Sequence, residues 1–169
     1  DDQALAAVKD AVGSLRVDIE AKLSMGLVNS PVPTNSIGVA TGNFVTARPL
    51  GIRDGVDYCH TGEVRRIDAT GIHQQLDAGR TVLLSPIGYS PTGEIFNLSA
   101  EEVATAASIA LHAEKLVMLV EGEGLRDSRR RFIHQLSLIE AEQILRSRRK
   151  LSDEWTRHLV NTIDSCRRR

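Results

Sequence analysis

The residues best suited to bind a ligand lie in and just after a glycine-rich loop at positions 86–94. Backbone N–H groups in such a loop can hold an anionic group, and the N-terminus of a helix favours one as well. Asn97 adds an amide that both donates and accepts hydrogen bonds. In the alternative interpretation, Asn97 only organises the turn and Glu101 only complements a helix dipole. The candidate ligand-binding residues are Gly88, Ser90, Thr92, Gly93, Asn97 and Glu101.

Two other loop patterns partly match catalytic or cofactor-binding motifs. Residues 88–92, GYSPT, follow a predicted strand, but a nucleophile elbow requires glycine where Thr92 stands and a helix directly afterwards. Residues 122–127, GEGLRD, begin like a dinucleotide fingerprint, yet Asp127 replaces the third glycine. We interpret Ser90 as a loop serine and residues 122–127 as a tight turn, and we predict no catalytic residue in the chain.

Cysteine and histidine residues indicate neither a metal site nor a disulfide framework. Cys59 and His60 have no second pair at metal-ligand spacing, and the other four histidines are scattered singly. Cys59 and Cys166 are the only cysteines among 169 residues, which favours a reducing, cytoplasmic setting. The first residue is Asp1 and the first methionine is Met25, so we expect the natural start to lie upstream.

Charge is distributed unevenly along the chain. Residues 1–122 carry nine basic and fifteen acidic residues, whereas residues 123–169 carry twelve and seven. A basic segment can meet phosphates, but no recognised nucleic-acid motif accompanies this one, and we interpret its charges as solvated helix faces and subunit contacts. No apolar run approaches the roughly 18 residues that a membrane span needs. We therefore expect neither nucleic acid nor a membrane as a partner.

Apolar spacing predicts the elements of the first half. A stripe at intervals of three and four predicts a helix over residues 2–25, followed by a connection at 29–33 that holds two prolines. Residues 37–41 and 44–48 favour β-strands with Gly42-Asn43 as a turn or bulge, and shorter β segments are expected at 56–59 and 63–67. Asp68 can cap a helix that runs to about Asp77 and ends at Gly79.

The second half shows the same alternation of strands and helices. Residues 81–85 form a continuous apolar run that predicts a strand buried on both faces, and residues 115–120 predict a second such strand. Ser99 and Glu102 have the spacing of a capping box for a helix to about residue 112, with a hydrophobic staple between residues 98 and 103. Ser137 and Glu140 repeat that spacing for a helix to about residue 148, and Ser152 is expected to open a last one.

This alternation predicts an α/β domain with a largely parallel sheet and an antiparallel hairpin addition near residues 37–67. In such folds ligands bind in the loops beyond the carboxyl ends of the strands. Here these are the loops after Ser85 and after Val120.

Four long strings resemble bacterial N-acetylglutamate synthase. They are GNFVTARPLG at 42–51, GVDYCHTGEVRRID at 55–68, LSPIGYSPTGE at 84–94 and FNLSAEEVAT at 96–105. The similarity spans about residues 1–120 and is looser from 121 to 169. It implies an amino-acid-kinase-like, carbamate-kinase-like three-layer sandwich, which this chain would contain incompletely at both ends.

The resemblance also implies a division of labour within the parent protein. Acetyl transfer from acetyl-CoA to L-glutamate would occur in a separate acetyltransferase domain outside residues 1–169, because no acetyl-CoA-binding motif is found here. The kinase-like part would bind L-arginine as a feedback inhibitor of arginine biosynthesis and would build a homo-oligomer. The chain itself would need no cofactor.

The resemblance further implies that kinase chemistry has been lost. Related kinases place an aspartate where Glu101 stands, four residues after the asparagine that Asn97 matches, and carry a lysine near residues 156–158, where this chain has none. We therefore interpret the loop at 88–93 with Asn97 and Glu101 as the remnant of a site for an acylated amino acid. Two alternatives remain open: an active acetylglutamate kinase that uses ATP, and a non-catalytic arginine-sensing module.

Overall fold

The computed structural model describes residues 2–25, 37–119, 131–146, 159–160 and 163. They fall into two compact units, Asp1–Leu111 and His112–Arg169. The first unit holds α1 (Asp2–Ser24), which confirms the predicted first helix. None of its residues is buried, and Leu15 and Val17 are more than half exposed. The predicted connection at 29–33 lies outside the described residues.

Two parallel strand pairings join residues 39–49 to residues 81–89. β1 (Val39–Ala40) pairs in parallel with β6 (Thr81–Val82), and β2 (Val45–Pro49) pairs in parallel with β7 (Ile87–Tyr89). β1 and β2 do not pair with each other, so Gly42-Asn43 is not a hairpin turn. Each of these strands instead pairs with a successive part of residues 81–89.

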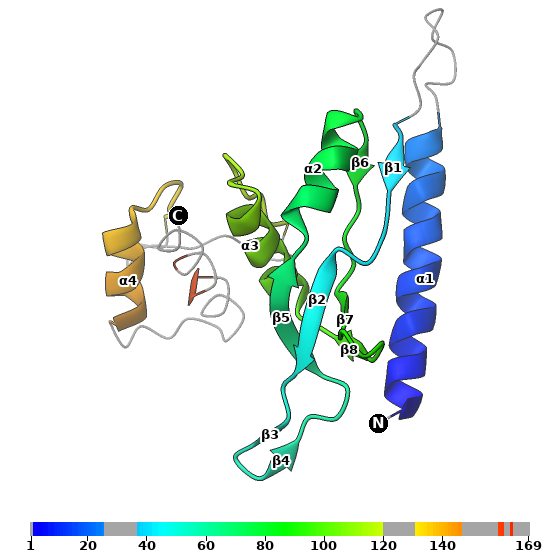
Figure 1. Ribbon diagram of the computed structural model, residues 1–169. Helices are drawn as coiled ribbons and strands as arrows, with labels where there is room; N and C mark the ends of the chain where they lie inside the picture. The colour runs from blue at the N-terminus through cyan, green and yellow to red at the C-terminus, as the bar shows by residue number, and fades with distance from the viewer. Residues whose placement is uncertain (1, 26–36, 120–130, 147–158, 161–162, 164–169) are drawn as a thin grey trace, which may run out of the picture. The chain divides into compact units, whose positions relative to one another are not determined.

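The larger sheet has the order β5-β2-β7-β8, and its outer pairings are antiparallel. β5 (Gly62–Ile67) pairs with β2, and β8 (Ile95–Asn97) pairs with β7. The chain segment that connects β2 to β5 forms a small hairpin of β3 (Ile52–Arg53) and β4 (Val56–Asp57). This hairpin extends away from the sheet (Figure 1). The predicted antiparallel addition is confirmed for residues 45–67.

The predicted caps of the next two helices are confirmed in part. α2 (Ala69–Asp77) begins after Asp68, whose side chain accepts a hydrogen bond from the Gly71 N–H. α3 (Ala100–Ala110) begins after Ser99, whose hydroxyl accepts from the Glu102 N–H. The return bond of the capping box is wrong, because the Glu102 carboxylate accepts from the Val64 N–H at 2.8 Å. Val64 lies on the edge strand β5, where a backbone N–H needs an acceptor outside the sheet.

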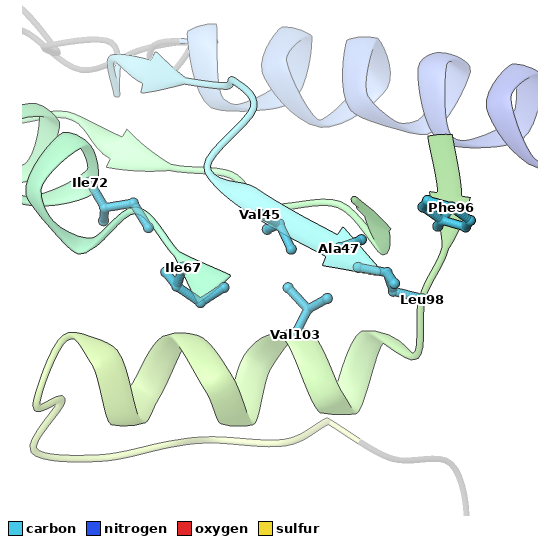
Figure 2. Close-up of a cluster of buried hydrophobic side chains, with 7 residues drawn as sticks. All are labelled: Val45, Ala47, Ile67, Ile72, Phe96, Leu98 and Val103. Carbon is cyan, nitrogen blue, oxygen red and sulfur yellow. The ribbon is translucent and has the colours of Figure 1, made fainter. Parts of the chain in front are cut away.

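The core of the first unit lies between the larger sheet and α3 (Figure 2). Val45 and Ala47 are two residues apart on β2 and face the same side of the sheet, as the two-residue period of a strand requires. Leu98 and Val103, the predicted staple pair, belong to the same cluster. The buried cluster consists of Val45, Ala47, Ile67, Ile72, Phe96, Leu98 and Val103. Burying each large aliphatic chain of this kind contributes roughly 1.5–3 kcal/mol.

Two strand predictions are corrected. Only Thr81 and Val82 of the run 81–85 form a strand, and Thr81 is exposed while residues 82–85 are half-buried. These residues are partly exposed because cavities lie on both sides of the segment. Leu84, Ser85 and Pro86 line one cavity beside α1 and another beside α3. The run 115–120 forms no strand over its described residues; Val117 is 76% and Leu119 96% exposed, and no described strand pairs with them.

The second unit contains α4 (Leu138–Arg146), and here the predicted capping box is confirmed in both directions. The Ser137 hydroxyl accepts from the Glu140 N–H, and the Glu140 carboxylate accepts from the Ser137 N–H at 2.8 Å and its hydroxyl at 2.7 Å. A small apolar cluster forms around Ala141, Leu159 and Ile163. Ser152, the expected start of a last helix, and the predicted turn at 122–127 lie outside the described residues, whereas residues 159–160 and 163 are helical.

Candidate functional site

The glycine-rich loop is a tight turn between β7 and β8. The hydroxyls of Ser90 and Thr92 lie 2.8 Å apart, and both donate to Oε2 of Glu94, at 3.2 and 2.9 Å. Glu94 was not among the predicted site residues, although it is the group on which the other two converge. Its position two residues after a threonine, where the turn returns into β8, was the signal available in the sequence.

The backbone of this turn is largely committed to the turn itself. The Ser90 N–H donates to the Glu94 carbonyl, the Gly93 N–H to the Ser90 carbonyl, and the Glu94 N–H to the Ser90 hydroxyl. Gly93 has a φ of 88°, which favours glycine there. An anion approaching these donors would also meet the Glu94 carboxylate. This geometry favours a structural turn over a cradle for phosphate.

Gly88 is required by packing. A Cβ built on it would lie 2.6 Å from Cβ of Ala47 and 2.8 Å from Cδ1 of Leu98. Gly88 is itself buried within β7. Its absent side chain therefore lets β7 lie against the core, where β2 and the residue after β8 meet it.

Asn97 and Glu101 lie away from the turn, at the other end of β8. The Asn97 N–H donates to the His60 carbonyl at 2.8 Å, and Asn97 forms a β-bridge with Thr61. Glu101 stands in the first turn of α3, where a carboxylate complements the helix dipole. The structure thus brings Ser90, Thr92 and Gly93 together, and leaves Asn97 and Glu101 as a second group at the start of α3.

The neighbourhood of Asn97 includes the base of the β3–β4 hairpin. His60 carries a side-chain contact as well, with Nε2 lying 2.7 Å from Oδ1 of Asp2 on α1. Cys59 is exposed and has a φ of 48°. Among the residues that the structure describes, no three histidine, cysteine or acidic side chains gather where a metal ion could bind. Nor does any described helix combine the length and apolarity that crossing a bilayer requires.

Residues 1–165 match the model of the amino acid kinase family. The chain belongs to the amino acid kinase family. This confirms the predicted α/β fold class, and it agrees with the parallel and antiparallel pairings described above.

Curated relatives also confirm the resemblance to bacterial N-acetylglutamate synthases. The chain is 46% identical over 170 residues to an amino-acid acetyltransferase from Aeromonas salmonicida, an alignment that covers 99% of this chain and 38% of that protein. It is 56% identical over 132 residues to another from Ectopseudomonas mendocina, covering 78% of this chain and 31% of the relative.

A solved structure is similar over the same range. It is N-acetylglutamate synthase from Neisseria gonorrhoeae complexed with coenzyme A and L-arginine, with a TM-score of 0.90 and 31% identity. The match covers 99% of this chain and 39% of that one. The same enzyme complexed with coenzyme A and N-acetyl-glutamate gives a TM-score of 0.85 at 30% identity. The chain therefore spans less than two fifths of the length of these relatives.

Proposed function

We propose that this chain is the kinase-like regulatory and oligomer-forming part of an N-acetylglutamate synthase. The whole polypeptide would transfer an acetyl group from acetyl-CoA to L-glutamate, in the cytoplasm, at the entry to arginine biosynthesis. The observation that carries this proposal is the match of almost the entire chain, at 46% identity, to 38% of an amino-acid acetyltransferase. The remaining length of such a relative has room for the separate catalytic domain.

The proposed reaction places no catalytic role in this chain. A general base would remove a proton from the glutamate ammonium group, and the free amine would attack the thioester carbonyl. The C–S bond would then break, the nitrogen would lose a second proton to the leaving thiolate, and the products would be coenzyme A as the thiol and N-acetylglutamate. The residues for these steps would lie outside residues 1–169, which supply control and assembly.

We also propose that the candidate site is a remnant of an acyl-amino-acid site that now serves the fold. The hydrogen bonds that close the 90–94 turn support this, as does the packing of Gly88 against Ala47. Glu101 supports the loss of kinase chemistry, because phosphoryl transfer depends on metal-holding aspartates and phosphate-binding lysines. L-Arginine is the proposed inhibitor of the parent protein, and the neighbour's complex with L-arginine supports that choice.

The proposal is tested on the full-length polypeptide that contains this chain. Thiol release from acetyl-CoA is measured with and without L-glutamate, and ADP release from ATP is measured with N-acetylglutamate. We expect glutamate-dependent thiol release that L-arginine lowers, and no ADP. ADP release without acetylation would replace the proposal with an acetylglutamate kinase. Calorimetric binding of L-arginine with neither activity would replace it with an arginine-sensing module.

A further inference from the structure

A cavity of about 250 Å³ lies between α1 and the segment that joins β6 to β7. On one side Val12, Leu15 and Ile19 contribute aliphatic side chains from α1, and on the other side Leu83 and Leu84 contribute two more. Small-molecule sites in proteins are mostly apolar hollows with a few polar groups, and the pockets that hold drug-sized ligands measure roughly 300–1,000 Å³. This cavity therefore suits a ligand somewhat smaller than that.

Polar groups are few around this cavity, and one of them is cationic. Arg16 on α1 lines it, together with the hydroxyl-bearing residues Thr41, Ser85 and Tyr89. No acidic side chain is among the described lining residues. A guanidinium presents a planar set of donors that matches a carboxylate with two parallel hydrogen bonds. The charge of the lining thus favours an anion over a cation.

Arg16 is held only weakly by its neighbour on the helix. Its Nε lies 3.7 Å from Oε1 of Glu20, with the two side chains 51% and 37% exposed. That separation is too long for a hydrogen bond, and exposed ion pairs at this spacing contribute little. A ligand carboxylate at the rim can therefore compete for the guanidinium.

We propose that this cavity binds a small monocarboxylate with an apolar body. The carboxylate pairs with Arg16, and the apolar part packs against the aliphatic side chains of α1 and residues 83–84. Tyr89, which lines the cavity, belongs to the same loop as the candidate site, but none of the candidate residues themselves lines it. The proposal does not depend on acetyl transfer by the parent protein, so either can fail alone.

The first test compares three probes on the full-length polypeptide by saturation-transfer NMR titration. Hexanoate has both recognition elements, hexanamide lacks the charge, and acetate lacks the apolar body. We expect saturable binding of hexanoate at least about tenfold tighter than that of the other two. Equal affinity for hexanamide or acetate overturns the proposal. So does the absence of saturable binding, which would mean that another part of the parent or a second copy fills the cavity.

The second test uses variants. Arg16→Gln should weaken hexanoate binding about tenfold, to the level of hexanamide, while Arg65→Gln, which changes an exposed arginine on β5 outside the cavity, should not. Val12→Phe should abolish binding of all probes by filling the space. Unchanged hexanoate affinity in Arg16→Gln overturns the proposal. If Val12→Phe fails to fold, the comparison of the two arginine variants still decides.

Discussion

Gly88 lies in a loop whose composition predicts ligand binding, and the structure gives this glycine a packing role. Ala47 and Leu98 leave no room for a Cβ at this position. Hydrogen bonds between residues 90, 93 and 94 close the loop that follows it.

Gly88→Ala should destabilise the protein by about 1–3 kcal/mol, the usual effect of forcing an extra methyl group into a packed core. Thermal unfolding of the full-length polypeptide would show this as a lower midpoint. Gly13→Ala is the matched control, because a Cβ at position 13 meets nothing within 4 Å in the helical α1. That control should be neutral or stabilising, by up to about 1 kcal/mol. Equal midpoints for the two variants would contradict the packing role.

Glu102 is a second residue with a specific structural role. Glu102→Ala removes the acceptor of the Val64 N–H, and a hydrogen bond to a charged group contributes roughly 1.5–3 kcal/mol. We expect the Val64 amide to exchange with solvent deuterium much faster in this variant. Glu102→Gln keeps an oxygen acceptor and should show a smaller change. Unchanged exchange in Glu102→Ala would rule out this contact.

At the scale of elements, a side-chain carboxylate ties the β3–β4 hairpin to the sheet, in addition to the backbone hydrogen bonds at the base of the hairpin. Glu63 on β5 accepts from Nε of Arg48 at 2.8 Å and from Nη2 of Arg53 at 3.1 Å. Glu63→Ala should speed tryptic cleavage after Arg53 several-fold, because the hairpin loses its anchor. The unfolding midpoint should change little, since exposed ion pairs contribute roughly 0–1 kcal/mol. Cleavage at the wild-type rate would show that the ion pairs do not restrain the hairpin.

The N-terminus of α4 should respond to acid. The Ser137 hydroxyl and then its backbone N–H donate to the Glu140 carboxylate, and these bonds lower the pKa of that group below its ordinary value. A carboxyl whose pKa is lower in the folded state stabilises the fold above its unfolded pKa, and loses that contribution as the pH falls through the folded pKa. In a ¹³C NMR titration, Ser137→Ala should raise the pKa of Glu140. An unchanged titration would contradict the cap.

Helices were more predictable than strands, and the reason is physical. α1, α2, α3 and α4 depend on local spacing and on caps such as Asp68 and Ser99, which are visible in the sequence. A strand depends on a partner that lies far away in the chain. The runs 81–85 and 115–120 are both rich in leucine and valine, yet only Thr81 and Val82 have a strand beside them in the described residues.

The candidate site was predictable only in its location. Glycine, serine and threonine indicate a loop at 88–93, but they do not say whether its N–H groups face a ligand or the loop itself. In the structure the N–H groups of Ser90, Gly93 and Glu94 donate within the loop, and these bonds form only in the folded turn. The cavity beside α1 was not predicted either, because it is formed by residues 12–19 and 83–86, which are distant in sequence.

At the scale of the whole molecule, the chain matches one part of longer relatives. It belongs to the amino acid kinase family, and its relatives named amino-acid acetyltransferase are more than twice as long. The proposed division, with control in a kinase-like part and acyl transfer in another part, would account for both facts. The features found in the described residues are structural: the hydrogen-bonded turn at 90–94, the packed Gly88 and the β3–β4 hairpin tied to Glu63.

The most direct test follows a single reaction mixture by NMR. The full-length polypeptide is given L-glutamate labelled with ¹⁵N, together with acetyl-CoA and ATP, and both ¹⁵N-coupled amide protons and ³¹P signals are recorded over time. The account predicts growth of the amide signal of N-acetylglutamate while the ATP phosphorus signals stay constant. Unlabelled N-acetylglutamate is then added to the same mixture. Conversion of ATP to ADP with an acyl phosphate signal, without any labelled amide, would contradict the account.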